Sequence, residues 1–246
     1  MASGRTSPAL CGCEDAAGGS VGEFVVKLRG AVQEFGLLNE LMGSKLATHF
    51  GIASPPAALI YIEPELVDLI SAVEPAQANL VARSVGLNFG TQALVGFSTW
   101  PVDKPIPDIM WDAAVNVFAF DALLQNPDRK HLNPNLMSKG DDLVVFDHEL
   151  AFSFLLDIFP SPIPWDLSSQ RYLEEHVFYR QLRSKPIDLT LFTANLTELS
   201  LDLVENIFAD VPSEWNNENA KKIAQHISIM RDHAEEFAEQ IRRFLV

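Results

Sequence analysis

The sequence predicts an α+β protein built in two parts. Strand and helix patterns alternate up to about residue 98, whereas helical patterns dominate the rest of the chain. The chain has 246 residues, of which 48% are apolar and 21% are charged, a composition typical of a folded globular protein. A chain of this length buries a sizeable core, so we expect one large domain or two lobes that share a cleft.

The first part begins with a segment rich in small residues, 7–22, which indicates loops and turns. A short apolar strand follows at residues 24–28. Apolar residues spaced by three and four then predict a helix over 32–50, and Gly51 is placed to end it. Residues 57–62 form a continuous apolar run, which is typical of a buried strand.

A second helix pattern and a third strand complete the first part. The helix is predicted over residues 64–85, and the strand covers residues 87–97 with glycine interruptions. Residues 98–107 then contain three prolines, which punctuate regular structure. We interpret this segment as a connection, and it divides the chain into two units, residues 1–98 and 99–246.

The second part is predicted to be mostly helical. A helix at residues 109–124 ends before a proline, and two short apolar runs between residues 136 and 146 predict a hairpin. Three or four helices follow. The clearest covers residues 223–244, where apolar residues recur at steps of four and three. We interpret it as a closing helix packed on the core rather than a coiled-coil surface, because about three heptads are short for a coiled coil.

Charge and cysteine content exclude several classes of protein. The formal net charge is −15, which disfavours a general nucleic-acid-binding surface and docking on anionic lipid. No apolar run approaches the roughly 18 residues of a membrane-spanning helix, and no signal peptide is visible. Cys11 and Cys13 are too few for a disulfide framework or a complete zinc site, so we expect a reducing, cytoplasmic location.

Polar residues that suit phosphate chemistry gather between the predicted helix at 109–124 and the hairpin. Asp128 and Asn133 lie five residues apart, and Asp147 directly follows an apolar strand. Each residue alone also fits ordinary turn chemistry. Together they follow the order of the catalytic loop and metal-binding aspartate of kinases. Their oxygen atoms suit Mg²⁺, and a carboxylate not bound to metal can accept a proton from a hydroxyl group.

Two charged residues in the first part complete this pattern. Lys27 ends the apolar strand, and Glu40 lies thirteen residues later on the following helix. This is the order expected of a phosphate-holding lysine and the carboxylate that orients it. His131 and His148 flank the loop residues and could tune proton transfer, although structural or solvent-facing roles are favoured.

Six short segments of the sequence together match the pattern of a known family. They are Gly4-Arg5-Thr6-Ser7-Pro8, Glu23-Phe24-Val25-Val26-Lys27, Asn39-Glu40-Leu41, Asn126-Pro127-Asp128-Arg129, Asn133-Pro134-Asn135-Leu136 and Phe146-Asp147-His148-Glu149. On these segments the chain resembles the HipA-like kinases, in particular the short single-domain HipA-related group. More distantly, it is similar to the protein-kinase and phosphoinositide-kinase superfamily.

The resemblance implies a bilobal protein-kinase-like fold with ATP and Mg²⁺ in the cleft. The N-lobe would be small and rich in strands with one main helix, and the C-lobe would be mostly helical. The resemblance also implies that Lys27 holds the α- and β-phosphates of ATP and that Glu40 orients Lys27. Asp128 would be the catalytic base, and Asn133 and Asp147 would be metal ligands.

The resemblance has implications for further positions as well. Lys130 stands where many protein kinases place a lysine on the γ-phosphate, and the backbone at 95–97 would face adenine. Ser7 opens the candidate phosphate-binding loop, residues 7–12, which lacks the full glycine-rich pattern. Pro127 replaces the arginine that precedes the catalytic aspartate in regulated protein kinases, so control through a phosphorylated activation loop is not expected.

The residues and the resemblance predict an ATP- and Mg²⁺-dependent kinase that transfers the γ-phosphate to a hydroxyl group, with a protein Ser or Thr as the favoured acceptor. Two alternatives stay open: a nucleotide-binding pseudokinase that acts as an interaction module, and a small-molecule kinase. Residues 186–220 contain seven acidic residues and no lysine or arginine, which favours a basic protein acceptor or partner.

Overall fold

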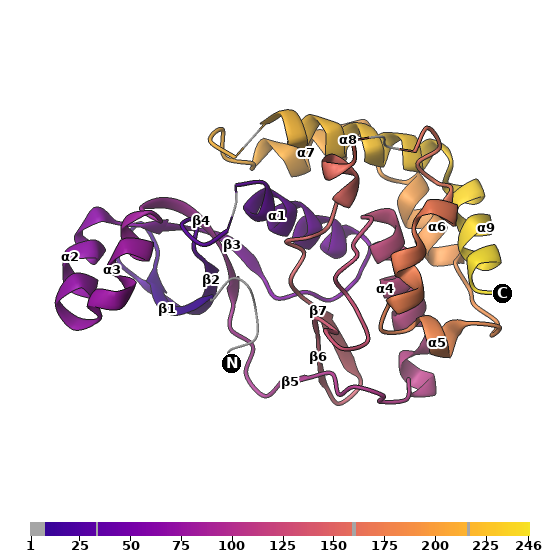
Figure 1. Cartoon of the computed structure of the whole chain (residues 1–246), viewed down its shortest axis with the longest axis horizontal. Coiled ribbons are helices and arrows are strands. Elements are labelled where there is room, and N and C mark those ends of the chain that lie inside the picture. Colours follow the sequence, from indigo (N-terminus) through magenta and orange to yellow (C-terminus); the bar gives the residue numbers. More distant parts are fainter. Residues whose placement is uncertain (1–7, 33, 159–160, 216) are drawn as a thin grey trace.

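The first part of the chain forms a four-stranded antiparallel sheet in the computed structural model, which describes residues 8–32, 34–158, 161–215 and 217–246. The strands lie in the order β1-β2-β4-β3 (Figure 1). Their bounds are Ala9–Glu14 (β1), Ser20–Lys27 (β2), Ala57–Ile62 (β3) and Gly86–Gln92 (β4). With the helices described below, this sheet makes an α+β chain, as the sequence predicts.

Strand β1 corrects the expectation that residues 7–22 form only loops and turns. Ala9, Cys11 and Cys13 alternate along β1 and pack against the apolar cluster on one face of the sheet. Side chains of a strand point alternately to its two faces, so small residues at every second position are enough to bury one face. Composition alone does not show this alternation, because Gly12 and Ser20 give the segment the character of a loop.

The candidate phosphate-binding loop at residues 7–12 is corrected for the same reason. Residues 9–12 belong to β1 and pair with β2. The turn between the two strands lies further on, where Asp15 Oδ1 accepts hydrogen bonds from the backbone N–H groups of Ala17 and Gly19, each at 2.9 Å. Ser7 lies outside the described residues.

Helix α1 (Glu34–His49) follows the sheet's second strand and agrees with the predicted helix at 32–50. The single helix predicted over 64–85 is instead two helices, α2 (Pro64–Val73) and α3 (Pro75–Ala82). Pro75 separates them because proline has no N–H group to donate within a helix. The pair lies at the outer end of the sheet and packs on Phe24 and Val26 of β2 (Figure 1).

A second sheet has the strand order β5-β6-β7. Strands β6 (Leu136–Lys139) and β7 (Asp142–Val145) form the predicted hairpin, so that prediction is confirmed. The strand predicted over 87–97 ends earlier, as β4, and a short strand β5 (Ser98–Thr99) joins β6 instead. Gly96 has a φ of 82° between them, a backbone conformation that favours glycine.

Helices make up most of the remaining described chain (Figure 1). The α-helices are α4 (Trp111–Leu123), α5 (Tyr179–Leu182), α6 (Thr190–Thr197), α7 (Leu201–Ala209), α8 (Asn217–Asp232) and α9 (Ala234–Phe244). Short 3₁₀ helices lie at Asp108–Met110, Ser153–Leu156, Leu167–Ser169 and Arg171–Glu175.

The helix predicted over 223–244 is divided between α8 and α9, with a break at His233. Its apolar face nevertheless packs inward, as the closing-helix interpretation requires. Ile223, Met230, Phe237 and Ile241 are each fully buried in the main core. These side chains are therefore used within the chain rather than on a coiled-coil surface.

The main core also includes one face of α1. Leu38, Met42 and Leu46 are buried there, as is Phe50 just after the helix, together with α4 residues such as Phe120. Helix α1 lies between the sheet and the helical part, and it is packed into the latter (Figure 1). Among the described residues, no helix is both long and apolar enough to cross a membrane.

Candidate active site

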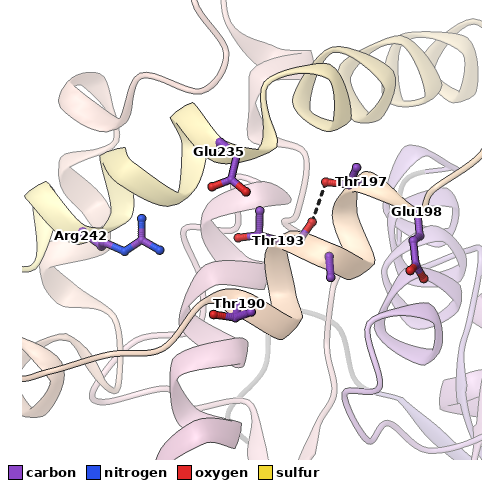
Figure 2. Close-up of a pocket in the computed structure, with 7 residues that line it drawn as sticks. Thr190, Thr193, Thr197, Glu198, Glu235 and Arg242 are labelled. Atoms are coloured by element: carbon purple, nitrogen blue, oxygen red, sulfur yellow. Dashed lines mark hydrogen bonds between the residues drawn. The ribbon is translucent and has the colours of Figure 1, made fainter.

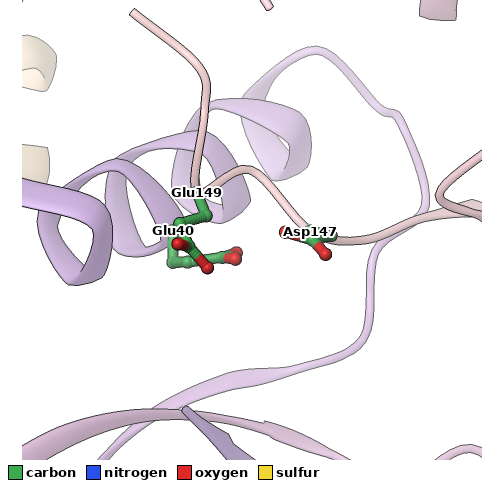
Figure 3. Close-up of side chains that lie close together, drawn as sticks. All are labelled: Glu40, Asp147 and Glu149. Carbon is green, nitrogen blue, oxygen red and sulfur yellow. The ribbon is translucent and has the colours of Figure 1, made fainter. Parts of the chain in front are cut away.

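Lys27 lies at the end of β2 and forms ion pairs with three carboxylates. Its ammonium group contacts Glu40 of α1, Asp147 Oδ1 at 2.7 Å and Glu149 Oε2 at 3.1 Å. Oxygen atoms of the three acids lie within 4.8 Å of one another. Figure 3 shows these three side chains converging between α1 and the segment that follows β7. The strand lysine and helix glutamate predicted from the sequence therefore meet, and Asp147 joins them.

Burial and neighbouring charges shift the pKa values of the groups in the cluster. Burial acts to lower the pKa of Lys27, but the charges of Glu40 and Asp147 overcome it and raise that pKa. Burial raises the pKa of Glu40 to about 7, against the opposing charge of Lys27. Burial also favours a raised pKa for Asp147, yet the ammonium of Lys27 holds it below the usual value. Lys27 thus stays charged, and Asp147 stays ionised at neutral pH.

Asp128 and Asn133 also lie together, in the loop after α4. Asp128 Oδ2 accepts hydrogen bonds from the side-chain amides of Asn133 and Asn135, each at 3.0 Å. Burial raises the pKa of Asp128, the charge of Asp147 acts in the same direction, and the two amides oppose them. The loop and the lysine cluster adjoin one another, because Asn135 bonds both to Asp128 and to the backbone N–H of Phe146, the residue before Asp147.

Arg129 holds this loop to the strand that leads to Asp147. It is fully buried, pairs with Asp121 of α4 through Nε at 2.6 Å, and donates from Nη1 to the carbonyl oxygens of Asn135 and Phe146. Burial would raise the pKa of Asp121, but Arg129 and His176 together lower it to about 2. Sequence reasoning missed this pair, whose only signal is an acid, Asp121, among the apolar residues in the last turns of α4.

The backbone adjacent to the site is unusual at two polar residues. Asp147 has a φ of 61° and Asn135 a φ of 47°, both in the left-handed region that few side chains other than Asn and Asp adopt readily. The N–H of Phe146 donates to the carbonyl of Asn135 at 3.1 Å, which links the two segments directly. An aspartate and an asparagine therefore occupy the two positions of the site whose backbone is left-handed.

The sheet face that carries Lys27 also presents apolar side chains. Val25 lies two residues before Lys27 on β2 and pairs with Leu10 of β1, so all three share one face. Leu10 is 63% exposed although it is apolar. Such an exposed apolar surface beside a buried ammonium is suited to a ligand with a flat apolar part and an anionic part.

The remaining predicted residues occupy different surroundings. Lys130 pairs with Glu175 at 3.1 Å, and both side chains are largely exposed. His131 pairs with Asp103 at 2.9 Å on the surface. His148, in contrast, is 1% exposed, which agrees with the structural role favoured from the sequence.

A cavity of about 400 Å³ lies elsewhere, between α6 and α9 (Figure 2). Its lining includes Thr190, Thr193 and Thr197 from α6, and Glu235 and Arg242 from α9. None of the residues predicted for phosphate chemistry lines it. The lysine cluster and the aspartate–asparagine loop therefore remain the candidate active site.

A buried lysine held by carboxylates beside an aspartate–asparagine loop is suited to phosphoryl transfer, the chemistry of kinases. Comparison with known protein families leads to the same class, because residues 1–243 match the family described as HipA-like kinase. The chain belongs to the HipA-like kinase family, which implies a kinase function. The resemblance noted from the sequence is thus confirmed. A comparison with curated proteins found no match.

Proposed function

We propose that the protein is an ATP- and Mg²⁺-dependent kinase that transfers the γ-phosphate to a hydroxyl group, with a protein Ser or Thr as the favoured acceptor. The observation that carries the proposal is the convergence of Lys27, Glu40 and Asp147 beside the Asp128 loop. We also propose that the chain is bilobal and protein-kinase-like, with residues 1–98 and 99–246 as its lobes.

The nucleotide would lie against the sheet face that carries Lys27. The apolar side chains of Leu10 and Val25 offer a surface for adenine, and the ammonium of Lys27 donates hydrogen bonds to phosphate oxygens. Glu40 is 2% exposed and holds Lys27 in this position. Sequence reasoning did not single out Leu10, because its exposure becomes visible only when the strands are paired.

Asp128 would accept the proton of the attacking hydroxyl group. Both side-chain amide hydrogen bonds to its carboxylate end on Oδ2, so Oδ1 would be the atom that accepts the proton. The raised pKa of Asp128, caused by burial, strengthens it as a base relative to an ordinary aspartate. Lys130 would contact the γ-phosphate after leaving its exposed pair with Glu175.

The donor set around Lys27 fits a magnesium ion. Its groups carry a formal charge of −2, one ammonium against three carboxylates, and carboxylate oxygens are preferred ligands of Mg²⁺. Asp147 and Asn133 would hold the ion, and when bound it neutralises negative charge on the phosphates. The cluster therefore supplies the carboxylates that a metal–nucleotide complex needs.

Asp128→Asn tests the proposal. The variant should bind ATP with Mg²⁺ as well as wild type does, shown by the rise in melting temperature, because it leaves Lys27 and Asp147 in place. Transfer of labelled phosphate from ATP to proteins of a cell lysate should fall by about 10²–10⁴-fold, the contribution typical of a general base.

Asp141→Asn, in the exposed turn of the β6–β7 hairpin, is the matched control and should leave transfer unchanged. Wild-type transfer rates in Asp128→Asn would show that Asp128 is not the base. Absence of any stabilisation of the wild type by ATP, with or without Mg²⁺, would contradict nucleotide binding altogether.

A basic acceptor or partner on the acidic segment 186–220 is a further part of the proposal. Two acids of this segment already pair within the chain, Asp210 with Lys45 and Glu214 with Arg29 at 3.8 Å. Others, such as Asp202 and Glu205 on α7, are exposed. Association with a basic peptide that weakens with added salt would support this part, and salt-independent association would contradict it.

A further inference from the structure

Helix α1 contacts the turn that carries Asp147 through one of its faces. The four positions involved are Gly36, Asn39, Glu40 and Gly43, whose spacing of three and four places them on the same side of the helix. Glu40 accepts a hydrogen bond on Oε2 from the backbone N–H of the residue after Asp147, at 3.0 Å. The other three positions have no part in the chemistry proposed above: Asn39 contacts the backbone of the turn, and the two glycines lie against side chains of His148 and Glu149.

Asn39 is joined to this backbone by two hydrogen bonds. Its side-chain Nδ2 donates to the carbonyl oxygen of Glu149 at 2.9 Å and to that of Ala151 at 2.7 Å. The side chain is 2% exposed, and Oδ1 has no hydrogen-bond partner within the described part of the chain. A buried amide whose two N–H groups are both used, while its oxygen is not, acts here as a donor to the turn.

The two glycines allow the helix and the turn to approach closely. A Cβ atom at Gly43 would lie 2.5 Å from Cβ and Cγ of His148, and one at Gly36 would lie 3.0 Å from Cγ of Glu149. Contacts of 2.5 Å do not occur between carbon atoms that are not bonded, so a side chain at position 43 would force the elements apart. The helix face is therefore shaped to fit this one segment.

We propose that Asn39 is a positioning residue, which fixes the turn that carries Asp147 by holding the carbonyl groups of Glu149 and Ala151. The proposal rests on the proposed function, in which Asp147 is a metal ligand. Because α1 is packed into the main core through Leu38 and Met42, Asn39 ties the metal-binding turn to a helix that is anchored in the core. The lysine, its glutamate partner and the metal-binding aspartate are then assembled by one fixed helix.

The anchoring itself is tested on the nucleotide-free protein by hydrogen–deuterium exchange. Asn39→Ala should speed exchange in peptides covering residues 146–152, since the amides of Ala151 and Phe152 are hydrogen-bonded in the structure. Asn88→Ala is the matched control: Asn88 is fully buried in β4 and donates Nδ2 to backbone carbonyls, those of Ser84 and Gly86 at 2.8 Å and that of Ile60 at 3.5 Å. It should leave exchange in residues 146–152 unchanged.

The consequence for the reaction is tested by the dependence of transfer on Mg²⁺. Asn39→Ala should raise the Mg²⁺ concentration for half-maximal transfer by about 10- to 100-fold, the usual effect of losing a group that orients a metal ligand. ATP affinity in the presence of a chelator should not change. Asn39→Gln keeps the amide and should recover part of the loss, whereas Asn88→Ala should retain the wild-type Mg²⁺ dependence even if it melts earlier.

The two readouts separate failure of this proposal from failure of the proposed function. Unchanged exchange at residues 146–152 in Asn39→Ala overturns the anchoring whatever the activity. Faster exchange with an unchanged Mg²⁺ dependence, or an equal shift in Asn88→Ala, overturns the positioning role. If the wild type shows no Mg²⁺-dependent transfer, the proposed function fails, and the exchange result still decides whether Asn39 holds the turn.

Discussion

Replacing His148 with leucine should make the protein less sensitive to acid. The His148 side chain is 1% exposed, and neither ring nitrogen has a hydrogen-bond partner among the described residues. Burial lowers the pKa of His148 from 6.5 to about 3, and the positive charge of Arg129 acts in the same direction. The folded protein therefore keeps this ring neutral at pH values where the unfolded chain binds a proton.

The size of the effect follows from the two pKa values. The stability due to the neutral ring is complete above pH 6.5, and it is lost as the pH falls toward 3. At pH 5, about 1.5 units below the unfolded value, the loss is about 2 kcal/mol, at roughly 1.36 kcal/mol per unit. Glu40 has the opposite effect on stability, because its pKa is raised to about 7 and the folded protein gains stability as the pH falls. Both proteins contain Glu40, so its contribution cancels when their losses are compared.

The assay is urea unfolding of wild type and His148→Leu at pH 7 and pH 5. The free energy of unfolding at pH 7 reports any change in packing against Phe120, whose ring meets the His148 ring edge-on. Between pH 7 and pH 5, the wild type should lose about 2 kcal/mol more than the variant. Equal losses in the two proteins would refute the reasoning, because they would mean that the ring is accessible to protons in the folded state.

Two further predictions concern buried charge and close packing. Arg129→Met should lower the free energy of unfolding, measured in urea, by about 3–5 kcal/mol because the buried Asp121 carboxylate loses its guanidinium partner and keeps, among the described residues, only Asn126 and His176. Lys45→Ala, which removes an exposed pair with Asp210, should lower the free energy of unfolding by less than about 1 kcal/mol. Equal losses in Arg129→Met and Lys45→Ala would contradict the difference expected between a buried and an exposed ion pair. Gly43→Ala should destabilise by about 1–3 kcal/mol in the same assay because its Cβ would press on the turn. Helix propensity alone would instead make Gly43→Ala more stable by about 1 kcal/mol. A variant that is more stable than wild type would therefore refute the prediction.

The regular elements that the sequence predicts well are those with a strong apolar period. Helix α1 has such a period because its face is buried in the main core, and the β6–β7 hairpin has two short apolar runs around a glycine turn. Breaks were harder to predict. Pro75 ends α2 although the apolar pattern continues through it, and the separation of α8 from α9 at His233 has no comparable signal in the sequence.

Some residues of the candidate site could be predicted from the sequence and others could not. Lys27, Asp128 and Asp147 could be found because their order along the chain is characteristic, although their roles stay predictions. Glu149 and Arg129 could not be found in this way, because their importance arises from contacts between segments distant in sequence. Periodicity reports which face of an element is buried, but it does not report which polar group meets another there.

The acidic character of the chain has a specific consequence at this site. The net charge is −15, and the groups around Lys27 carry a formal charge of −2. A triphosphate that approaches without a cation is repelled by Asp147 and Glu149, and the single ammonium of Lys27 is already engaged by both. Under the proposed function, nucleotide affinity should therefore depend on Mg²⁺ more steeply than in a site with one carboxylate. Glu149→Gln should reduce that dependence by removing one of the charges.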